Sequence, residues 1–178
     1  MSKNNLVDTD KQQHDAQKIC PCLWFDSKAE EAANLYVSIF KNSKIESITR
    51  YGKEGSELHH MKEGTVMTVE FQLEGQKYLG LNGGPVFQFN EAISFQIMCD
   101  TQKEIDYYWN KLSDGGDPNA QQCGWLKDQY NLSWQVVPRL LPQLIKDSNP
   151  KKSQSVIHAI LQMKKINIDE LQTAYNNV

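Results

Sequence analysis

The sequence predicts an α+β protein made of two similar modules, each with the order strand, helix, strand, strand, strand (βαβββ), followed by a helical C-terminal extension. Segments with apolar residues at every second position alternate with segments whose apolar residues follow helical spacing. A strand-to-helix motif, Phe25-Asp26-Ser27-x-x-Glu30, recurs 74 positions later as Cys99-Asp100-Thr101-x-x-Glu104. After Pro138 only helical spacing remains. Together these features predict two packed copies of one supersecondary unit.

The same patterns set the expected boundaries. Residues 1–17 are polar and without periodicity, and we expect them to form a mobile N-terminal arm. Residues 18–138 are expected to form one domain of two modules, at about 18–85 and 90–138. Residues 139–178 are expected to form the extension, which clasps either the sheet or a partner subunit.

Each expected module starts with a strand that leads into a capped helix. In the first, a strand ends at Phe25, and Ser27 with Glu30 makes a capping box for a helix that reaches Phe40. In the second, Thr101 and Glu104 make the corresponding box. The other strands of the first module are expected at 45–51, 65–73 and 77–82. In the second module, the first strand is expected at 92–99 and a hairpin at 123–127 and 132–137.

Composition excludes several classes of protein. The 178 residues carry a net charge of −3, with no basic surplus to suggest nucleic-acid binding. No apolar run is long enough to cross a membrane, and the N-terminus lacks the apolar segment of a signal peptide. The four cysteines are therefore expected to be reduced, and the protein to be cytoplasmic.

Three long segments resemble one protein family. They are LWFDSKAEEAANLYVSIFKNSKI, LNGGPVFQFNEAISFQIMCDTQKEIDYYWNKLSDGG and QCGWLKDQYNLSWQVVP, and the HAILQMKKINIDELQTAY tail agrees too. They are similar to the PhnB-like branch, named 3-demethylubiquinone-9 3-methyltransferase, of the glyoxalase/bleomycin-resistance (vicinal oxygen chelate) superfamily. The resemblance implies two curved sheets, a concave cavity for a small-molecule ligand, and commonly a homodimer.

Strand alternation gives the candidate site. The more apolar face of each strand is expected to meet the helices, so that the other face lines the cavity. Glu70 on that face is the candidate catalytic acid or base, because burial would raise its pKa. The candidate ligand-binding residues on the same face are Phe25, Tyr78, Asn82, Ser94, Gln96 and Gln135.

No metal or cofactor is expected. The resemblance places the metal-ligand positions of the superfamily at Pro21, Gly80, Ser94 and Gln135, a set that contains at most one weak ligand. The histidines at His59, His60 and His158 lie in a polar loop and in the tail, away from the predicted strands.

A methyltransferase is not favoured by the sequence, because the Gly-rich stretch at 81–85 continues into a loop rather than a helix.

Three functions remain open. The first is a metal-independent small-molecule binding protein or enzyme of the PhnB-like branch. The second is a metal-dependent lyase, isomerase or dioxygenase. The third is a protein that sequesters a compound without chemistry, as bleomycin-resistance proteins do. The sequence does not indicate the ligand or the reaction.

Overall fold

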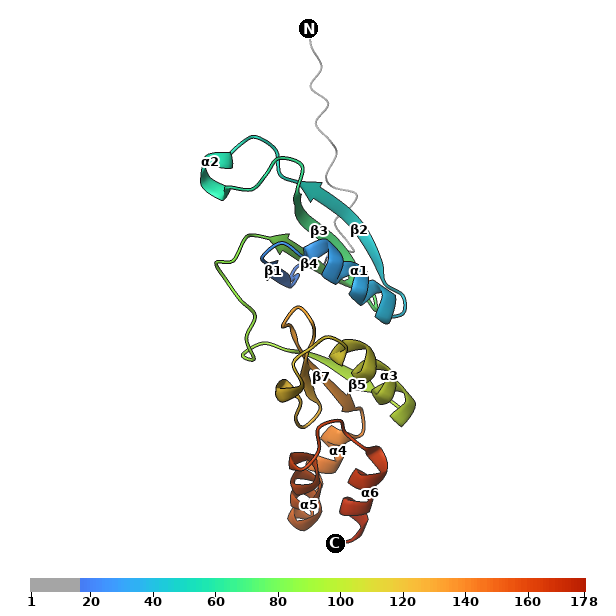
Figure 1. The fold of residues 1–178 in the computed structure, drawn as a ribbon. Helices are drawn as coiled ribbons and strands as arrows, with labels where there is room; N and C mark the ends of the chain where they lie inside the picture. Colours follow the sequence, from blue (N-terminus) through green and yellow to red (C-terminus); the bar gives the residue numbers. More distant parts are fainter. Residues whose placement is uncertain (1–16) are drawn as a thin grey trace. The chain divides into compact units, whose positions relative to one another are not determined.

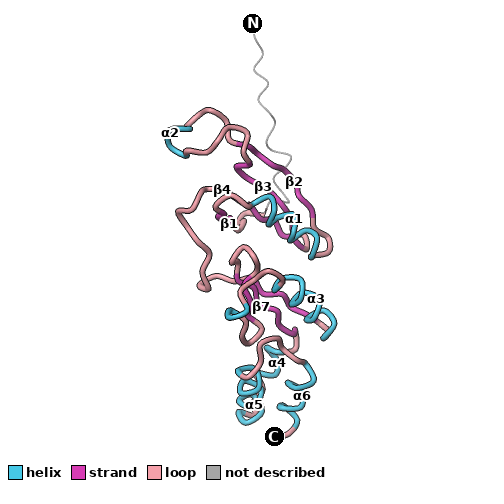
Figure 2. The backbone as a smooth tube through the Cα atoms, in the orientation of Figure 1, coloured by secondary structure: helices cyan, strands magenta, loops and turns pink. Residues whose placement is uncertain are grey.

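The computed structural model describes residues 17–178, which form two compact units: unit 1 ends at Val86, and unit 2 spans Phe87–Val178. The predicted arm, apart from its last residue, lies outside the described residues. That last residue, Gln17, is held by Lys77, whose backbone N–H donates to Gln17 Oε1 at 2.9 Å. Figure 2 shows the loop that follows the last strand of unit 1 and leads to the first strand of unit 2.

Unit 1 has the predicted βαβββ order. Its sheet has the strand order β1-β4-β3-β2, in which β1 runs parallel to β4 and the other pairs are antiparallel. Helix α1 lies along this sheet (Figure 1). The elements are β1 (Cys22–Phe25), α1 (Ala29–Ile39), β2 (Lys44–Arg50), α2 (Ser56–His59), β3 (Val66–Leu73) and β4 (Gln76–Asn82).

The core of unit 1 lies between α1 and the sheet. Tyr36 of α1 is fully buried, with its ring centroid 6.3 Å from that of Phe71. Phe71 in turn stacks on Tyr78 of the neighbouring strand at 5.4 Å. Near the amino end of α1, a Cβ atom at Gly80 would be 3.2 Å from the Ala29 Cβ atom, so glycine lets the helix approach the strand closely.

The start of α1 differs from the sequence prediction. The helix begins at Ala29 without a side-chain cap from the residues before it, so the capping box predicted at Ser27 and Glu30 was wrong. A residue from β4 takes its place: Asn82 Oδ1 accepts a hydrogen bond from the Ala29 backbone N–H at 2.8 Å. The Asn82 side chain also donates to the Val66 carbonyl oxygen at 3.1 Å. A buried long-range amide thus fixes the helix to the sheet.

Unit 2 repeats this plan with one strand fewer. Its three-stranded sheet has the order β5-β7-β6, in which β5 is parallel to β7 and β6 antiparallel to it. Where unit 1 has β2, the Gly/Asp/Pro-rich segment 113–121 forms turns and one short 3-10 helix. The elements are β5 (Phe95–Cys99), α3 (Gln102–Ser113), η2 (Pro118–Ala120), β6 (Trp125–Lys127), β7 (Ser133–Pro138), α4 (Leu141–Ile145), α5 (Pro150–Leu161) and α6 (Ile168–Asn176).

The capping box predicted for α3 is confirmed. The Thr101 side chain accepts from the Glu104 backbone N–H, and the Glu104 carboxylate accepts from the Thr101 backbone N–H. The helix buries one apolar face against the sheet, where Trp134 lies in the core. Trp134 Nε1 donates to Asp128 Oδ2 at 2.8 Å, and Asp128 Oδ1 accepts two backbone N–H groups of the β6–β7 turn. The buried carboxylate is thereby fully bonded and holds the turn.

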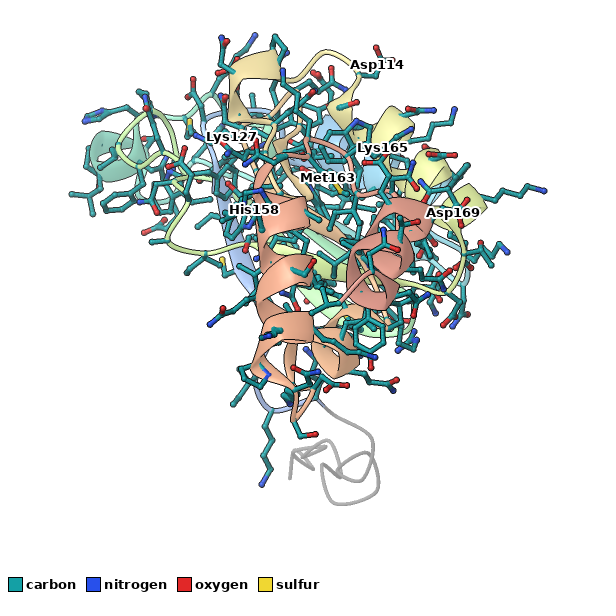
Figure 3. The ribbon with its side chains drawn as sticks, turned by 90° about the horizontal axis from the view of Figure 1, so that it is seen from below. Asp114, Lys127, His158, Met163, Lys165 and Asp169 are labelled. Atoms are coloured by element: carbon teal, nitrogen blue, oxygen red, sulfur yellow. The ribbon has the colours of Figure 1, made fainter. Side chains whose placement is uncertain are left out.

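The C-terminal helices pack on unit 2. Val137 of β7 is buried in an apolar cluster with Val156, Ile166 and Leu171, and Met98 of β5 packs against it. Figure 3 shows α5, which carries the labelled His158, beside α6, which carries Asp169. The expected extension at 139–178 is therefore part of unit 2, and it covers part of the sheet face that lies away from α3. No helix among residues 17–178 is long and apolar enough to cross a membrane.

Candidate functional site

The unit 2 sheet carries a chain of three polar side chains on the face away from α3. Gln96 of β5 and Gln135 of β7 are paired in the parallel register, and their side chains project to the same face. Gln96 Nε2 donates to Gln135 Oε1 at 3.0 Å, and Gln135 Nε2 donates to Ser94 Oγ at 2.7 Å. Trp125 of β6 lies opposite Gln135 in the antiparallel register and shares this face. We call these four residues the glutamine face.

The direction of these hydrogen bonds decides what the glutamine face offers a ligand. Each bond uses one donor hydrogen and one acceptor oxygen, which leaves the Ser94 hydroxyl proton, the Gln96 carbonyl oxygen and the second N–H of each glutamine amide without a bond among the described residues. A ligand therefore meets the Ser94 donor at one end of this row of hydrogen bonds, and both an acceptor and a donor of Gln96 at the other. None of the four side chains ionises near neutral pH, so the face binds by hydrogen bonding and ring contact.

The C-terminal helices bound this face on one side. Met98 and Val137 follow Gln96 and Gln135 along their strands on the same face of the sheet. Both are covered by the apolar cluster of α4, α5 and α6 described above. The glutamine face is thus the part of this side of the sheet that the extension leaves open, and it borders an apolar wall.

A cavity of about 380 Å³ adjoins the glutamine face at β6, and we call it the β6 cavity. Its walls are mainly apolar, and Trp125 belongs both to the cavity and to the glutamine face. Its volume falls in the usual range of small-molecule sites, roughly 300–1,000 Å³. Among the residues that line it are Glu91, Ala120, Trp125, Leu126, Lys127 and Ser133.

Two polar residues stand out among those that line the β6 cavity. The Ser133 hydroxyl oxygen is buried and has no hydrogen-bond partner among the described residues. Opposite it on β6, Lys127 Nζ lies 2.5 Å from Glu91 Oε1. The Lys127 side chain is 19% exposed, whereas that of Glu91 is 65% exposed. The hydrogen bond from Lys127 holds the pKa of the Glu91 carboxyl below its ordinary value.

Unit 1 presents a different surface on the corresponding face of its sheet. Glu70 projects there but is exposed, and its Oε2 atom accepts a hydrogen bond from Ser47 Oγ at 3.0 Å. The burial that the predicted acid or base role requires is absent. Cys20 and Cys22 are free, exposed thiols, and partial burial is the first cause that raises the pKa of each. This face therefore lacks a buried acid or base in the described chain.

The predicted ligand-binding role of Phe25, Tyr78 and Asn82 rested on a face assignment that was wrong. All three side chains are buried on the side of the sheet that α1 covers. Every residue from Cys20 to the end of β1 at Phe25 is apolar, so alternation did not identify the buried face of this strand. In β4, the helix needs a small residue at Gly80 and a cap from Asn82, which places Leu79 and Leu81 on the other face.

The structure places the other predicted ligand-binding residues together. Ser94, Gln96 and Gln135 form the glutamine face, whereas Glu70 belongs to the separate sheet of unit 1. Trp125 and Lys127 were missed. Trp125 lies on a strand of three residues, too short for alternation to show its face, and the cavity residues meet through the β6–β7 register. A search for lysines in predicted hairpins would have found Lys127.

The donor set of the described residues does not fit a metal of the kind the superfamily resemblance implies. Within residues 17–178, no group of three or more His, Cys, Asp and Glu side chains is placed to hold a metal ion. Of the positions predicted from the resemblance, Gly80 faces α1 and Pro21 has no donor atom, while Ser94 and Gln135 are bonded to each other. Two neutral oxygen ligands are too few for a divalent site.

The histidines belong to other parts of the surface. His59 Nδ1 accepts from the Met61 backbone N–H at 2.9 Å, and its ring lies 4.6 Å from that of Tyr51. His60 lines a separate hollow of about 350 Å³ beside the start of α1, together with Glu30 and others. His158 is exposed on α5 (Figure 3). His14 lies outside the described residues.

Comparison with known proteins identifies the family. The model of the family described as 3-demethylubiquinone-9 3-methyltransferase matches residues 17–137, more than half of the chain. The chain belongs to this family. A solved structure of a PhnB protein of the same description, from Bacillus cereus, is 39% identical, with a TM-score of 0.58, and the match covers 68% of this chain and 99% of that one.

A more distant structure also shares the fold. Protein PA1353 from Pseudomonas aeruginosa is 17% identical with a TM-score of 0.54, and the match covers 69% of this chain and 98% of that one. The fosfomycin resistance protein FosX from Listeria monocytogenes is 13% identical with a TM-score of 0.43, over 69% and 93% of the two chains. No functionally curated protein matches the chain. The family and its structural neighbours identify the glyoxalase/bleomycin-resistance fold of the vicinal oxygen chelate superfamily.

Proposed function

We propose that the protein binds a small organic molecule on the glutamine face, without a metal ion, through hydrogen bonds to Ser94, Gln96 and Gln135. The observation that carries this proposal is the directed hydrogen-bond chain on a sheet face bordered by Trp125 and an apolar wall. Small-molecule sites typically combine apolar walls with a few polar groups that fix the ligand's orientation. Donors and an acceptor of the glutamine face are already available to a ligand.

Sequestration without chemistry is the second candidate function, and the residues of the glutamine face favour it. General acid or base catalysis needs a side chain that gains or loses a proton near the working pH. Amides, an indole and a serine without a base beside it do not meet that need. The glutamine face thus suits holding a compound better than converting it, and the reaction, if the protein has one, requires a group from elsewhere.

Methyl transfer, the activity in the family's description, is not part of this proposal. The segment between β4 and β5 is a loop, so Gly83 and Gly84 do not lead from a strand into a helix. A Gly-rich turn that seats a nucleotide-like cofactor normally opens a helix whose N-terminus faces the ligand. A metal-dependent lyase or dioxygenase is disfavoured for the reason given above, the absence of a matching donor set among residues 17–178.

A fragment screen tests the proposal. Saturation-transfer NMR with a library of small polar aromatic and aliphatic compounds should find ligands that bind the full chain. Replacing Gln135 with leucine should abolish binding of those ligands, because it removes the hydrogen bonds of Gln135 to both Gln96 and Ser94. Gln72→Leu is the matched control, since Gln72 lies on the unit 1 sheet and bonds Glu46. Ligands that bind Gln135→Leu as well as the parent protein would contradict the proposal.

We also propose a cytoplasmic homodimer, as the superfamily resemblance implies. Exposed apolar residues on the C-terminal extension support a contribution of this region: Ile145, Ile157 and Leu161 are 38%, 41% and 54% exposed. Light scattering at micromolar concentration should give twice the chain mass of 20.4 kDa. Replacing Leu161 with glutamate should shift the protein toward the monomer. A mass of one chain at every concentration would refute this assembly.

A further inference from the structure

We propose that the β6 cavity binds the carboxylate of a small, mainly apolar acid, and that Glu91 occupies the position of that carboxylate when no ligand is bound. This inference deepens the proposed function and rests on it, because it names the class of ligand. The β6 cavity shares Trp125 with the glutamine face, so one molecule can contact both. The evidence comes from one buried hydroxyl, one ion pair and the walls around them.

The buried hydroxyl of Ser133 indicates that a polar ligand atom belongs in the cavity. Ser133 is 1% exposed, and its oxygen has no hydrogen-bond partner within residues 17–178. Buried polar atoms in folded proteins are nearly always bonded, because an unbonded one loses its hydration without compensation. Ser133 lies within β7, so its backbone cannot move it to solvent. Ser133 is among the residues that line the cavity, so a rotation of its side chain would let a ligand oxygen or nitrogen satisfy this hydroxyl as donor or acceptor.

The ion pair indicates the charge of that ligand. The Lys127 side chain is 19% exposed and its ammonium group pairs with a carboxylate, so a negative partner stabilises it beside the cavity. Its present partner, Glu91, comes from the loop before β5 and is largely exposed. The Glu91 side chain can turn into solvent with little change in its exposure, whereas the less exposed Lys127 side chain stays beside the cavity. A ligand carboxylate can therefore take over the bond to Lys127 while Glu91 turns to water.

The lining of the cavity indicates that the part of the ligand beyond its carboxylate is apolar. The lining of the cavity is mainly apolar, and the only acidic side chain among its lining residues is Glu91. An apolar body gains from contact with these groups, and an aromatic ring also gains from the indole. A positive charge on the ligand would find no buried acidic partner among these lining residues. The chemistry thus favours an arylalkyl or alkyl monocarboxylate over a sugar, a nucleotide or a cation.

A matched pair of compounds tests this inference on the full chain. The probes are 3-phenylpropionate and its uncharged analogue 3-phenylpropan-1-ol, with affinities measured by calorimetry. The parent protein should bind the acid about tenfold more tightly than the alcohol, the size expected for one charge-assisted hydrogen bond. Glu91→Gln should strengthen binding of the acid several-fold, because the competing carboxylate is gone. Lys127→Met should remove the preference for the acid.

Two further variants separate this effect from a loss of folding. Ser133→Ala should weaken binding of both probes about fivefold, since it removes one neutral hydrogen bond. Lys165→Met is the control, because Lys165 also pairs with an acid, Asp106, in unit 2 but does not line the cavity. It should bind both probes like the parent. Thermal unfolding of each variant confirms that it is folded before its affinity is compared.

The outcomes distinguish this inference from the proposed function. Equal affinity for acid and alcohol, or an unchanged affinity in Glu91→Gln, would overturn the carboxylate assignment even if other fragments bind in a Gln135-dependent way. Failure of the acid to bind, while such fragments do bind, would overturn it too. If no fragment of any class binds the parent protein, the proposed function fails and this inference fails with it.

Discussion

The two sheets of the protein share a plan but carry different chemistry at matching positions. Both pair their first strand in parallel with their last, so that Cys22 lies opposite Leu79 in unit 1 and Gln96 opposite Gln135 in unit 2. Unit 2 places amides where unit 1 places a thiol and a hydrocarbon side chain. Repetition of a supersecondary unit thus preserves the backbone arrangement while each copy acquires its own surface.

The two helices also start by different means. In unit 1, Asn82 at the end of β4 reaches across to cap α1. The matching position in unit 2 is Pro138, which pairs with Cys99 as Asn82 pairs with Phe25. Proline has no side-chain acceptor, and α3 is capped locally by Thr101 instead. A cap from a distant strand couples helix and sheet, whereas a local cap stabilises the helix alone.

The largest expected effect is at the distant cap. Asn82→Ala removes the acceptor for Ala29 N–H and the donor to the Val66 carbonyl, both in or near the core. We expect unit 1 to lose about 3 kcal/mol of unfolding free energy, from a lost cap and unsatisfied buried groups. Hydrogen exchange of the α1 amides measures this loss. If α1 kept its protection, the distant cap would not hold the helix to the sheet.

The next effect is a pH dependence of the unfolding free energy. It is expected from Cys99 in unit 2 and not from Phe25, the matching position in unit 1. Burial, followed by the nearby Glu104 and Asp100 carboxylates, raises the pKa of the Cys99 thiol from 9.0 to about 12. The folded chain therefore keeps this proton more tightly than the unfolded chain does. The resulting stability is complete below pH 9 and is lost as pH rises from 9 toward 12, by up to about 1.4 kcal/mol per pH unit.

Urea unfolding of the parent protein and Cys99→Ala between pH 8 and 11 measures this dependence. The parent should lose stability more steeply above pH 9 than the variant, although the variant starts lower. Phe25, the counterpart in unit 1, has nothing to ionise. Equal slopes for the two proteins would show that Cys99 ionises as readily in the folded chain as in the unfolded one.

The smallest effect concerns the local cap. Thr101→Ala should lower the stability of α3 by about 1 kcal/mol, because one cap hydrogen bond is lost at an exposed helix end. Ser27→Ala is the matched control at the corresponding place in unit 1, where the side chain does not cap α1. It should change stability by less than about 0.5 kcal/mol. A larger effect at Ser27 than at Thr101 would reverse the assignment of the two caps.

The sequence predicted the fold well where local signals were strong. The alternation of Thr68, Glu70 and Gln72 against Val69 and Phe71 identified the buried face of β3, because the two sets differ sharply in polarity. The Thr101 capping box was equally local. The segment 113–121 was correctly predicted as a loop, but the sheet of the second module consequently has three strands and not the four of the βαβββ plan.

The site was harder to predict, because it depends on contacts between distant segments. Strand β4 is the clearest case. Its more apolar residues, Leu79 and Leu81, lie on the face away from α1, whereas Asn82 is buried because it caps that helix. Polarity alone points the wrong way when a buried polar residue has a structural partner. In unit 2 the polar set had no such task, and Gln96 and Gln135 lie where alternation put them.

Side-chain amide NMR of the full chain, titrated with a fragment that binds it, tests the proposed glutamine face most directly. The ¹⁵N-bound side-chain resonances of Gln96 and Gln135 should shift together on binding. A ligand bonded to Gln96 or to Ser94 polarises both hydrogen bonds that link these residues through Gln135. The Gln72 side chain on the unit 1 sheet should not respond. Shifts at Gln72, or at the hollow beside α1, with no change at Gln96 and Gln135 would contradict binding at the glutamine face.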